Sequence, residues 1–170
     1  MPKQEETFAF KGCRLTNVYG RIRPEQADEV IRLWRSNGVV APAEAARRCR
    51  EVVFTIHNEA GDLIGVNTVY VADFRRLGTP YYFYRTFIRA SDRGVSGLPE
   101  LTLRLTCEFL RGHPHPQRPA GVIIETENPK LMRRAQSAKL ARLGFRKLGT
   151  NQRGQDVLYH NFDGSHLASA

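Results

Sequence analysis

The hydrophobic residues of this chain switch several times between helical and extended spacing, which predicts a mixed fold. From Pro24 to Asn37 they fall on one broad face, with acidic residues in the first turn and Gly38 directly after the last. This stretch therefore predicts an amphipathic helix that ends at Asn37. From Val52 to His57 the residues are β-branched and aromatic, which is typical of a strand.

The same patterns assign the rest of the chain. Strands are predicted at residues 13–21, 52–57, 63–72, 79–90, 121–126, 145–148 and 157–162. Helices are predicted at residues 24–37, 42–50, 98–111 and 129–144. Short turns separate the three consecutive strands in the middle, so these are expected to form an antiparallel meander. The fold class is therefore α+β, with a mixed sheet flanked by helices.

Length and composition narrow the class of protein. With 170 residues, of which 41% are hydrophobic and 25% charged, the chain is expected to form one globular domain. No apolar run is long enough to cross a membrane and no secretory signal is visible, so a cytoplasmic protein without a membrane partner is predicted. Residues 1–11 are expected to be an N-terminal extension, 12–162 the folded domain and 163–170 a mobile tail.

The cysteines and histidines predict no metal site. Cys13, Cys49 and Cys107 form no Cys-x-x-Cys pair, which favours a reducing compartment over a disulfide framework. Each cysteine is expected to be a small buried hydrophobe, with a nucleophilic role as the alternative. His113 and His115 flank a proline and are expected to lie in a loop.

The net charge of +9 points to an anionic partner: a nucleic acid, a phosphorylated cofactor or an acidic protein. Of the 26 basic residues, 21 are arginines, which bind phosphate and carboxylate through two hydrogen bonds. The arginines are scattered along the chain, however. A biased nucleotide composition of the genome, which enriches arginine without any function, therefore explains them equally well. A nucleic-acid partner is disfavoured, because no zinc spacing, RNA-recognition motif or helix-turn-helix is recognisable.

The most informative stretch is residues 93–98, which join the aromatic strand to the next helix. Gly94 and Gly97 let the backbone approach an anion, and the free N–H groups of the first helical turn point at it. Arg93 would add a charged contact. The stretch therefore predicts a phosphate-binding loop, with an ordinary turn as the alternative.

This loop and the order of elements resemble the GNAT (Gcn5-related N-acetyltransferase) superfamily over residues 12–162. The superfamily signature Val-x-Pro-x-x-Arg-Gly-x-Gly-x-Gly/Ala aligns with residues 88–98, where Arg93 and Gly94 match. Ala90 replaces the proline, Ser96 the second glycine and Leu98 the last small residue. Residues 60–65 resemble the superfamily's hairpin, residues 124–128 its fifth strand, and residues 144–145 the Gly-Phe pair after its last helix.

The resemblance implies a mostly antiparallel central sheet with splayed fourth and fifth strands. It implies direct transfer of an acetyl or other acyl group from coenzyme A to an amine in a ternary complex. The residues that would hold acetyl-CoA, or another acyl-CoA, are Phe87, Ile88, Arg93, Gly94, Val95, Ser96, Gly97, Leu98 and Asn128. A main-chain N–H near Phe87 and Ile88 would polarise the thioester carbonyl.

Acyl transfer to an amine needs a base, because amines are mostly protonated at neutral pH. Glu125 is the predicted base and Glu127 a predicted substrate ligand, since both follow an apolar strand and share one face; two solvated charges are the alternative. Tyr84 is the predicted acid, and Tyr82 is expected to line the acceptor site, with core packing as the alternative for both. Arg85 is expected to bind an acidic acceptor group or to pair with a glutamate.

Some positions depart from the superfamily's pattern. Leu140 occupies the place of its common general-acid tyrosine, and Ser96 and Leu98 make the loop less open. Two alternatives follow: a non-catalytic GNAT-like binding module, or an acyltransferase whose donor is an acidic acyl carrier protein, which suits the positive charge. The acceptor is expected to be a small-molecule or peptide amine, and a homodimer is left open as a possibility.

Five basic residues near the last helix are expected to form a solvated face of that helix. Contact with the adenosine 3′-phosphate or with a carrier protein is the alternative for this set: Lys130, Arg133, Arg134, Lys139 and Arg142.

Overall fold

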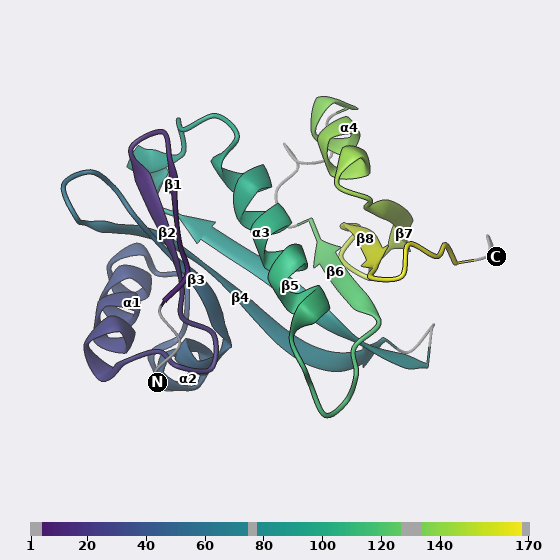
Figure 1. The fold of residues 1–170 in the computed structure, drawn as a ribbon, viewed down its shortest axis with the longest axis horizontal. Helices are drawn as coiled ribbons and strands as arrows, with labels where there is room; N and C mark the ends of the chain where they lie inside the picture. Colours follow the sequence, from purple (N-terminus) through teal and green to yellow (C-terminus); the bar gives the residue numbers. More distant parts are fainter. Residues whose placement is uncertain (1–4, 75–77, 127–133, 168–170) are drawn as a thin grey trace. The chain divides into compact units, whose positions relative to one another are not determined.

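A computed structural model gives the structure of residues 5–74, 78–126 and 134–167 (Figure 1). The strands among these residues are β1 (Thr7–Phe10), β2 (Cys13–Asn17), β3 (Val52–His57), β4 (Leu63–Phe74), β5 (Thr79–Ile88), β6 (Gly121–Glu125), β7 (Arg146–Thr150) and β8 (Asp156–Asn161). The helices are α1 (Pro24–Asn37), α2 (Pro42–Arg48), α3 (Leu98–Gly112) and α4 (Arg134–Arg142), with 3-10 turns at Cys49–Glu51 and Ala90–Asp92. None of these helices is both long enough and apolar enough to cross a bilayer.

The strands form a mixed sheet in which most neighbours are antiparallel. Hydrogen-bonded neighbours follow the order β1-β2-β3-β4-β5-β6-β8-β7. The pairs β1–β2, β2–β3, β3–β4, β6–β8 and β7–β8 are antiparallel, whereas β5 and β6 are parallel. The predicted α+β class with a mostly antiparallel sheet is therefore confirmed.

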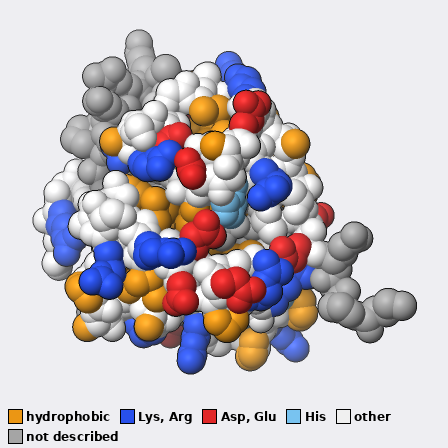
Figure 2. All heavy atoms as spheres, turned by 90° about the vertical axis from the view of Figure 1, so that its left-hand side faces the viewer, with side chains coloured by type: hydrophobic (Ala, Val, Ile, Leu, Met, Phe, Trp, Pro, Cys, Tyr) orange, Lys and Arg blue, Asp and Glu red, His pale blue; other side chains and the backbone are white. Residues whose placement is uncertain are grey.

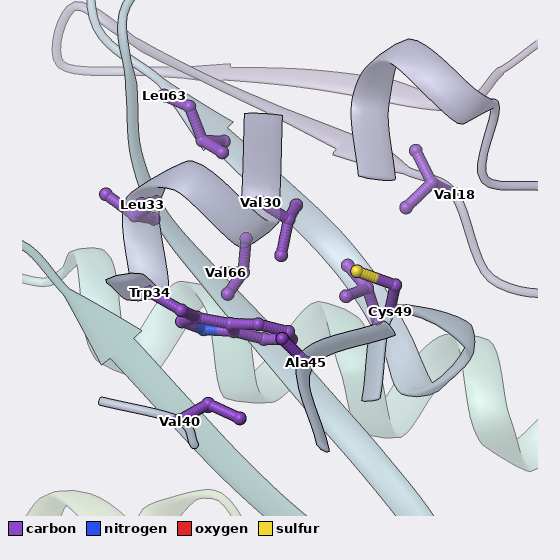
Figure 3. Packing of buried hydrophobic residues seen from close by; sticks show 10 residues of the cluster. Val18, Val30, Leu33, Trp34, Val40, Ala45, Cys49, Leu63 and Val66 are labelled. Carbon is purple, nitrogen blue, oxygen red and sulfur yellow. The ribbon is translucent and has the colours of Figure 1, made fainter. Parts of the chain in front are cut away.

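The chain groups into two compact units, each with its own hydrophobic cluster. The first unit comprises residues 1–69 and 85–102, and the second comprises residues 70–84 and 103–170. In the first unit, Trp34 of α1 is buried beside Ala45 of α2 and Val66 of β4 (Figure 3). In the second unit, Tyr81, Ile123 and Tyr159 form the buried cluster.

Helix α1 shows how local signals set the ends of an element. Pro24 stands at its first position, and the Gln26 side chain accepts a hydrogen bond of 2.9 Å from the Arg23 backbone N–H. Gly38 follows the helix in the left-handed conformation, with φ of 62°, where glycine carries no steric cost. The predicted helix at residues 24–37 is confirmed at both ends.

Most predicted boundaries need small corrections, and polar side chains explain the larger ones. The first predicted strand, 13–21, ends at Asn17, because the Asn17 side chain accepts from the Tyr19 N–H at 3.0 Å and turns the chain. The strand predicted at 79–90 ends at Ile88, because Asp92 accepts hydrogen bonds from Arg89 and Ser91 and favours a 3-10 turn. The start of the helix predicted at 129–144 lies outside the described residues.

A strand that the sequence reading did not predict begins the chain. Thr7–Phe10 pairs with β2 within the stretch that was expected to be an N-terminal extension. Lys11 and Gly12 join the two strands with φ of 45° and 77°, so both turn residues are left-handed, as in a type I′ hairpin turn. The domain boundaries themselves stay predictions.

Candidate functional site

The loop before α3 is held by short-range backbone bonds that leave its surface open. The Leu98 N–H donates to the Val95 carbonyl at 3.2 Å, and the Leu101 N–H donates to the Gly97 carbonyl at 3.0 Å. Gly97 has φ of 86°, a conformation that favours glycine. The Leu98 side chain is fully buried, so the leucine that departs from the superfamily's small residue does not obstruct the loop.

Four backbone donors of this loop are available to a ligand. Among the described residues, no hydrogen bond engages the N–H groups of residues 94–97. A side-chain carbon added at Gly94 would meet nothing within 4 Å, so the space beside it is open. Successive free N–H groups ahead of a helix form a concave site for the oxygens of a phosphate.

Arg93 links the loop to the end of β5. Its Nε donates to the Ile88 carbonyl at 2.8 Å, and its guanidinium carbon lies 6.0 Å from the centre of the Phe87 ring. The residue is otherwise exposed, so its terminal nitrogens remain available to an anion. Three of the residues predicted to bind the coenzyme are thus brought together.

The main chain of β5 continues to Ile88, beyond the residues that pair with β6. The Arg89 N–H donates to the Ile64 carbonyl of β4 at 2.8 Å. Backbone groups of successive residues in a strand point to opposite sides, so the Ile88 N–H and carbonyl face away from β4. The Arg93 bond to the Ile88 carbonyl agrees with this direction. The resemblance implied that a main-chain N–H near this position would polarise the thioester carbonyl.

Lys11 is a charged residue of this loop region that sequence reasoning missed. Its Nζ donates to the Ser96 carbonyl at 2.9 Å and lies 5.2 Å from the centre of the Phe10 ring. A side-chain carbon at Gly97 would meet the Phe10 ring at 3.4 Å, so the tip of the β1–β2 hairpin packs directly on the loop. A basic residue followed by glycine between two short apolar runs was the available signal.

Acidic groups near the loop are partly neutralised. Asp92 lies 2.5 Å from the Nε of Arg89, and this hydrogen bond lowers the pKa of the Asp92 carboxyl. Glu100 stands in the first turn of α3. Two further carboxylates lie nearby, since Glu59 stands beside Gly12 and Asp62 interacts with Arg89. The three cations of this region, Lys11, Arg89 and Arg93, therefore stand among carboxylates. On the face drawn in Figure 2, Lys and Arg side chains likewise stand among Asp and Glu rather than in one basic patch.

Three of the residues predicted to act on the acceptor, Tyr82, Tyr84 and Glu125, lie in the second unit, whereas Arg85 lies in the first. Tyr82 and Tyr84 pair with Val122 and Ile124 in the β5–β6 ladder. Both tyrosines are buried, and Tyr82 is 0% exposed, which favours core packing for its side chain. Glu125 is exposed, which agrees with the alternative to a catalytic role, a solvated charge at the end of a strand.

The register of β5 and β6 separates the two predicted catalytic residues. Tyr84 shares a face with Ile124, whereas Glu125, one residue further, projects from the opposite face. Glu125 pairs with Val157, which belongs to the hydrophobic cluster of the second unit. Glu125 therefore projects from the face of the sheet that carries Tyr81 and Ile123. Glu127, Asn128, Lys130 and Arg133 lie outside the described residues.

Arg85 pairs with a glutamate, which is one of its two expected roles. Its Nη1 lies 4.0 Å from Oε2 of Glu51, while Oε1 of Glu51 accepts from Arg47 at 2.7 Å. Burial, and then the Arg85 charge, lower the pKa of Arg48, and burial together with Glu51 raises the pKa of Tyr19. Glu51 is thus the carboxylate around which several cations of the first unit gather.

The cysteines are expected to resist alkylation in the folded protein. All three are free and buried, and burial raises the pKa of Cys49 to about 11 and of Cys107 to about 12. At pH 8 a thiol of pKa about 12 is a thiolate in about one molecule in ten thousand, and only the thiolate reacts. Reaction with a thiol reagent, followed at pH 8, should be slow until denaturant is added. Rapid labelling of one native cysteine would instead support the nucleophilic alternative.

Comparison with known proteins identifies the fold. No protein-family model matches the sequence. No curated protein matches it. Among solved structures, the ribosomal-protein-S5-alanine acetyltransferase of Vibrio fischeri is 14% identical and covers 95% of this chain and 100% of its own, with a TM-score of 0.61.

Two further solved structures agree with the first. The GNAT domain of S. lividans PAT is 11% identical, with 92% of this chain and 96% of that chain covered and a TM-score of 0.65. A GNAT-family acetyltransferase from Listeria monocytogenes is 15% identical, with 92% and 99% covered and a TM-score of 0.61. The chain therefore has the GNAT fold, as the resemblance in its sequence implied.

Proposed function

We propose that this protein is an acyltransferase of the GNAT kind, which moves an acetyl or other acyl group from coenzyme A to an amine. The fold it shares with known acetyltransferases supports the reaction class. The acceptor is a small-molecule or peptide amine. Direct attack of the amine on the thioester needs no covalent intermediate on the protein, which is consistent with three buried cysteines.

The observation that carries the proposal is the open loop before α3. It combines the free N–H groups of residues 94–97 with the terminal nitrogens of Arg93 and the ammonium group of Lys11. A diphosphate presents several oxygens and more than one negative charge, so it matches several N–H donors and two cations. The residues present therefore fit the diphosphate of coenzyme A.

The end of β5 would hold the part of the coenzyme that reacts. The Ile88 N–H, on the side away from β4, is suited to a hydrogen bond with an amide chain such as pantetheine, whereas the Ile88 carbonyl already accepts from Arg93. The same N–H would stabilise the negative charge that develops on a thioester oxygen during attack. Glu125 as base, Tyr84 as acid, and Tyr82 and Glu127 as acceptor ligands stay predictions.

Calorimetric titration with acetyl-CoA tests the proposal. Saturable binding at one site is expected, and Arg93→Gln should weaken it about tenfold, because a hydrogen bond to a charged group contributes about 1.5–3 kcal/mol. Lys11→Gln should weaken it by a smaller factor, because Lys11 is exposed and screened by solvent. Arg35→Gln, which removes an exposed positive charge at the end of α1, is the matched control and should leave the affinity unchanged.

A second candidate is the non-catalytic binding module, and Leu140 favours it. The side chain at this position of α4 has no proton to give to a leaving thiolate. Release of free coenzyme A in the presence of a panel of amines separates the two candidates. Turnover with any amine supports the transferase, whereas tight binding without turnover supports the module. Absence of acetyl-CoA binding would contradict both and leave the carrier-protein donor.

A further inference from the structure

The second unit contains a cavity of about 310 Å³ at the end of α3. It is lined by the last turn of this helix and by the connection to β6, which is the green loop below both elements in Figure 1. Arg111, Arg118, His113 and His115 contribute polar groups, and Tyr82 and Phe162 contribute aromatic rings. No Asp or Glu is among the described residues that line it. The cavity therefore offers donors and positive charge without a compensating carboxylate.

Arg111 is held in place by a neutral histidine. Nδ1 of His160 lies 3.2 Å from the Gly144 carbonyl, which can only accept, so Nδ1 carries the hydrogen. Nε2 is then the acceptor for Nη2 of Arg111 at 3.4 Å. Burial lowers the pKa of His160, and its ring centre lies 5.4 Å from that of Phe145 and 6.3 Å from that of Phe162. The guanidinium of Arg111 is thereby positioned at the cavity.

A tight turn at residues 115–118 forms another part of the cavity wall. The Arg118 N–H donates to the His115 carbonyl at 3.0 Å, and the Gln117 N–H donates to Nδ1 of His115 at 3.2 Å. Because Nδ1 of His115 accepts, its Nε2 carries a hydrogen and remains a donor. Arg118 has φ of 48°, a conformation that costs a non-glycine residue about 1 kcal/mol or more. The turn thus orients the imidazole N–H of His115 and places Arg118, like Arg111, in the lining of the cavity.

The walls between these polar groups are apolar. The His115 ring meets the Tyr82 ring edge-on at 5.7 Å between centres, and Phe162 lies 6.2 Å from Tyr82. Tyr82 is fully buried, so its ring packs behind the His115 and Phe162 rings that line the cavity. A volume of about 310 Å³ lies at the lower end of the range of small-molecule pockets, so a compact ligand suits it.

We propose that this cavity binds a small organic anion, in which one phosphate or carboxylate group is attached to a compact apolar body. Arg111, Arg118 and the His115 N–H bind the acidic group, and the Phe162 ring contacts the body. Arginine suits either acid, because its planar donors match two oxygens at once. The arginines and histidines of the cavity play no part in the proposed acyl transfer, so the two proposals stand independently.

Nuclear magnetic resonance titration of the full chain with phenyl phosphate and with benzoate tests the proposal at constant ionic strength. Saturable shifts are expected at the backbone amides of residues 111–118 with at least one probe, with millimolar or tighter affinity for a ligand of this size. Benzyl alcohol, which has the ring without the charge, and inorganic phosphate, which has the charge without the ring, should each bind at least fivefold more weakly. Equal binding of either would overturn the proposal.

Charge variants separate this site from general attraction to a basic protein. Arg118→Gln and Arg111→Gln should each weaken phenyl phosphate binding fivefold or more, whereas Arg153→Gln, in the β7–β8 turn, should change it less than twofold. All three positions are exposed, so a dispersed spectrum is expected of each variant. Shifts that spread over the surface and weaken equally in Arg153→Gln would overturn the proposal.

Discussion

Replacing Gly121 by alanine is expected to lower the free energy of unfolding by about 3 kcal/mol or more, at the upper end of the costs of overpacking. The added carbon would lie 1.9 Å from the His160 carbonyl oxygen and 2.9 Å from the Asn161 Cα. Gly121 pairs with Asn161 in the β6–β8 ladder, so these atoms belong to a backbone that cannot turn away. The strands must separate there, which also disturbs the buried hydrogen bond from Tyr81 to Asn161.

Thermal unfolding of the Gly121→Ala variant measures this effect. A loss of this size lowers the melting temperature by about 6–12 °C in a chain of this length, at about 2–4 °C per kcal/mol. Gly112→Ala is the matched control, because nothing lies within 4 Å of its added carbon and alanine favours a helix by up to about 1 kcal/mol over glycine. An unchanged melting temperature for Gly121→Ala would contradict the close approach of β6 and β8.

Gly65→Ala is expected to cost about 1–3 kcal/mol of stability and, if the proposed function holds, to weaken acetyl-CoA binding. Its added carbon would lie 2.8 Å from the Phe87 carbonyl oxygen and 3.2 Å from the Ile88 side chain. This steric overlap is relieved only if β4 and the end of β5 move apart. That movement displaces the main-chain N–H of Ile88 that is proposed to hold pantetheine and polarise the thioester.

Two measurements on Gly65→Ala distinguish the structural effect from the functional one. Chemical denaturation reports the stability, and calorimetry at a temperature where the variant is folded reports acetyl-CoA affinity. Gly112→Ala should change neither the affinity nor, by more than about 1 kcal/mol, the stability. A destabilised Gly65→Ala variant that binds acetyl-CoA normally would confirm the packing but place the coenzyme away from Ile88.

The parts of the fold that sequence patterns predicted well are those held by neighbours along the chain. Helix α1 begins at Pro24 and ends before Gly38 because the groups that satisfy its ends lie within a few residues of them. The strand Val52–His57 was predicted at both ends from its composition. The loop at residues 93–98 was also recognised, because its glycines and the following helix are adjacent in the chain.

Polar side chains that compete with strands are harder to anticipate from a pattern. The predicted strands at 13–21 and 79–90 were too long, because Asn17 and Asp92 bond to nearby groups and end them. The hairpin of β1 and β2 was missed, because its four-residue first strand is too short to show a repeating pattern of hydrophobic residues. In each case one side chain or one turn decides where the strand begins or ends.

What only the tertiary structure decided is which distant residues meet. Lys11 reaches the carbonyl of Ser96, 85 residues away, and Arg85 reaches Glu51. The register of β5 and β6 places Tyr84 and Glu125 on opposite faces, although their spacing in the sequence gives no hint of it. Tyr82, which was expected to line an acceptor site, is fully buried and packs against His115 and Phe162 beside a basic cavity.

The physical reason is the range of the interactions involved. Turn chemistry, helix ends and hydrophobic periods act over a few residues, so the sequence by itself determined most of the elements and their order, and it marked one glycine-bearing loop as a candidate phosphate site. Strand register and long-range ion pairs result from packing summed over the whole core, in which a shift of one residue reverses every side chain. Those contacts placed Lys11 at the loop, separated Tyr84 from Glu125, and gathered two arginines around the cavity at the end of α3.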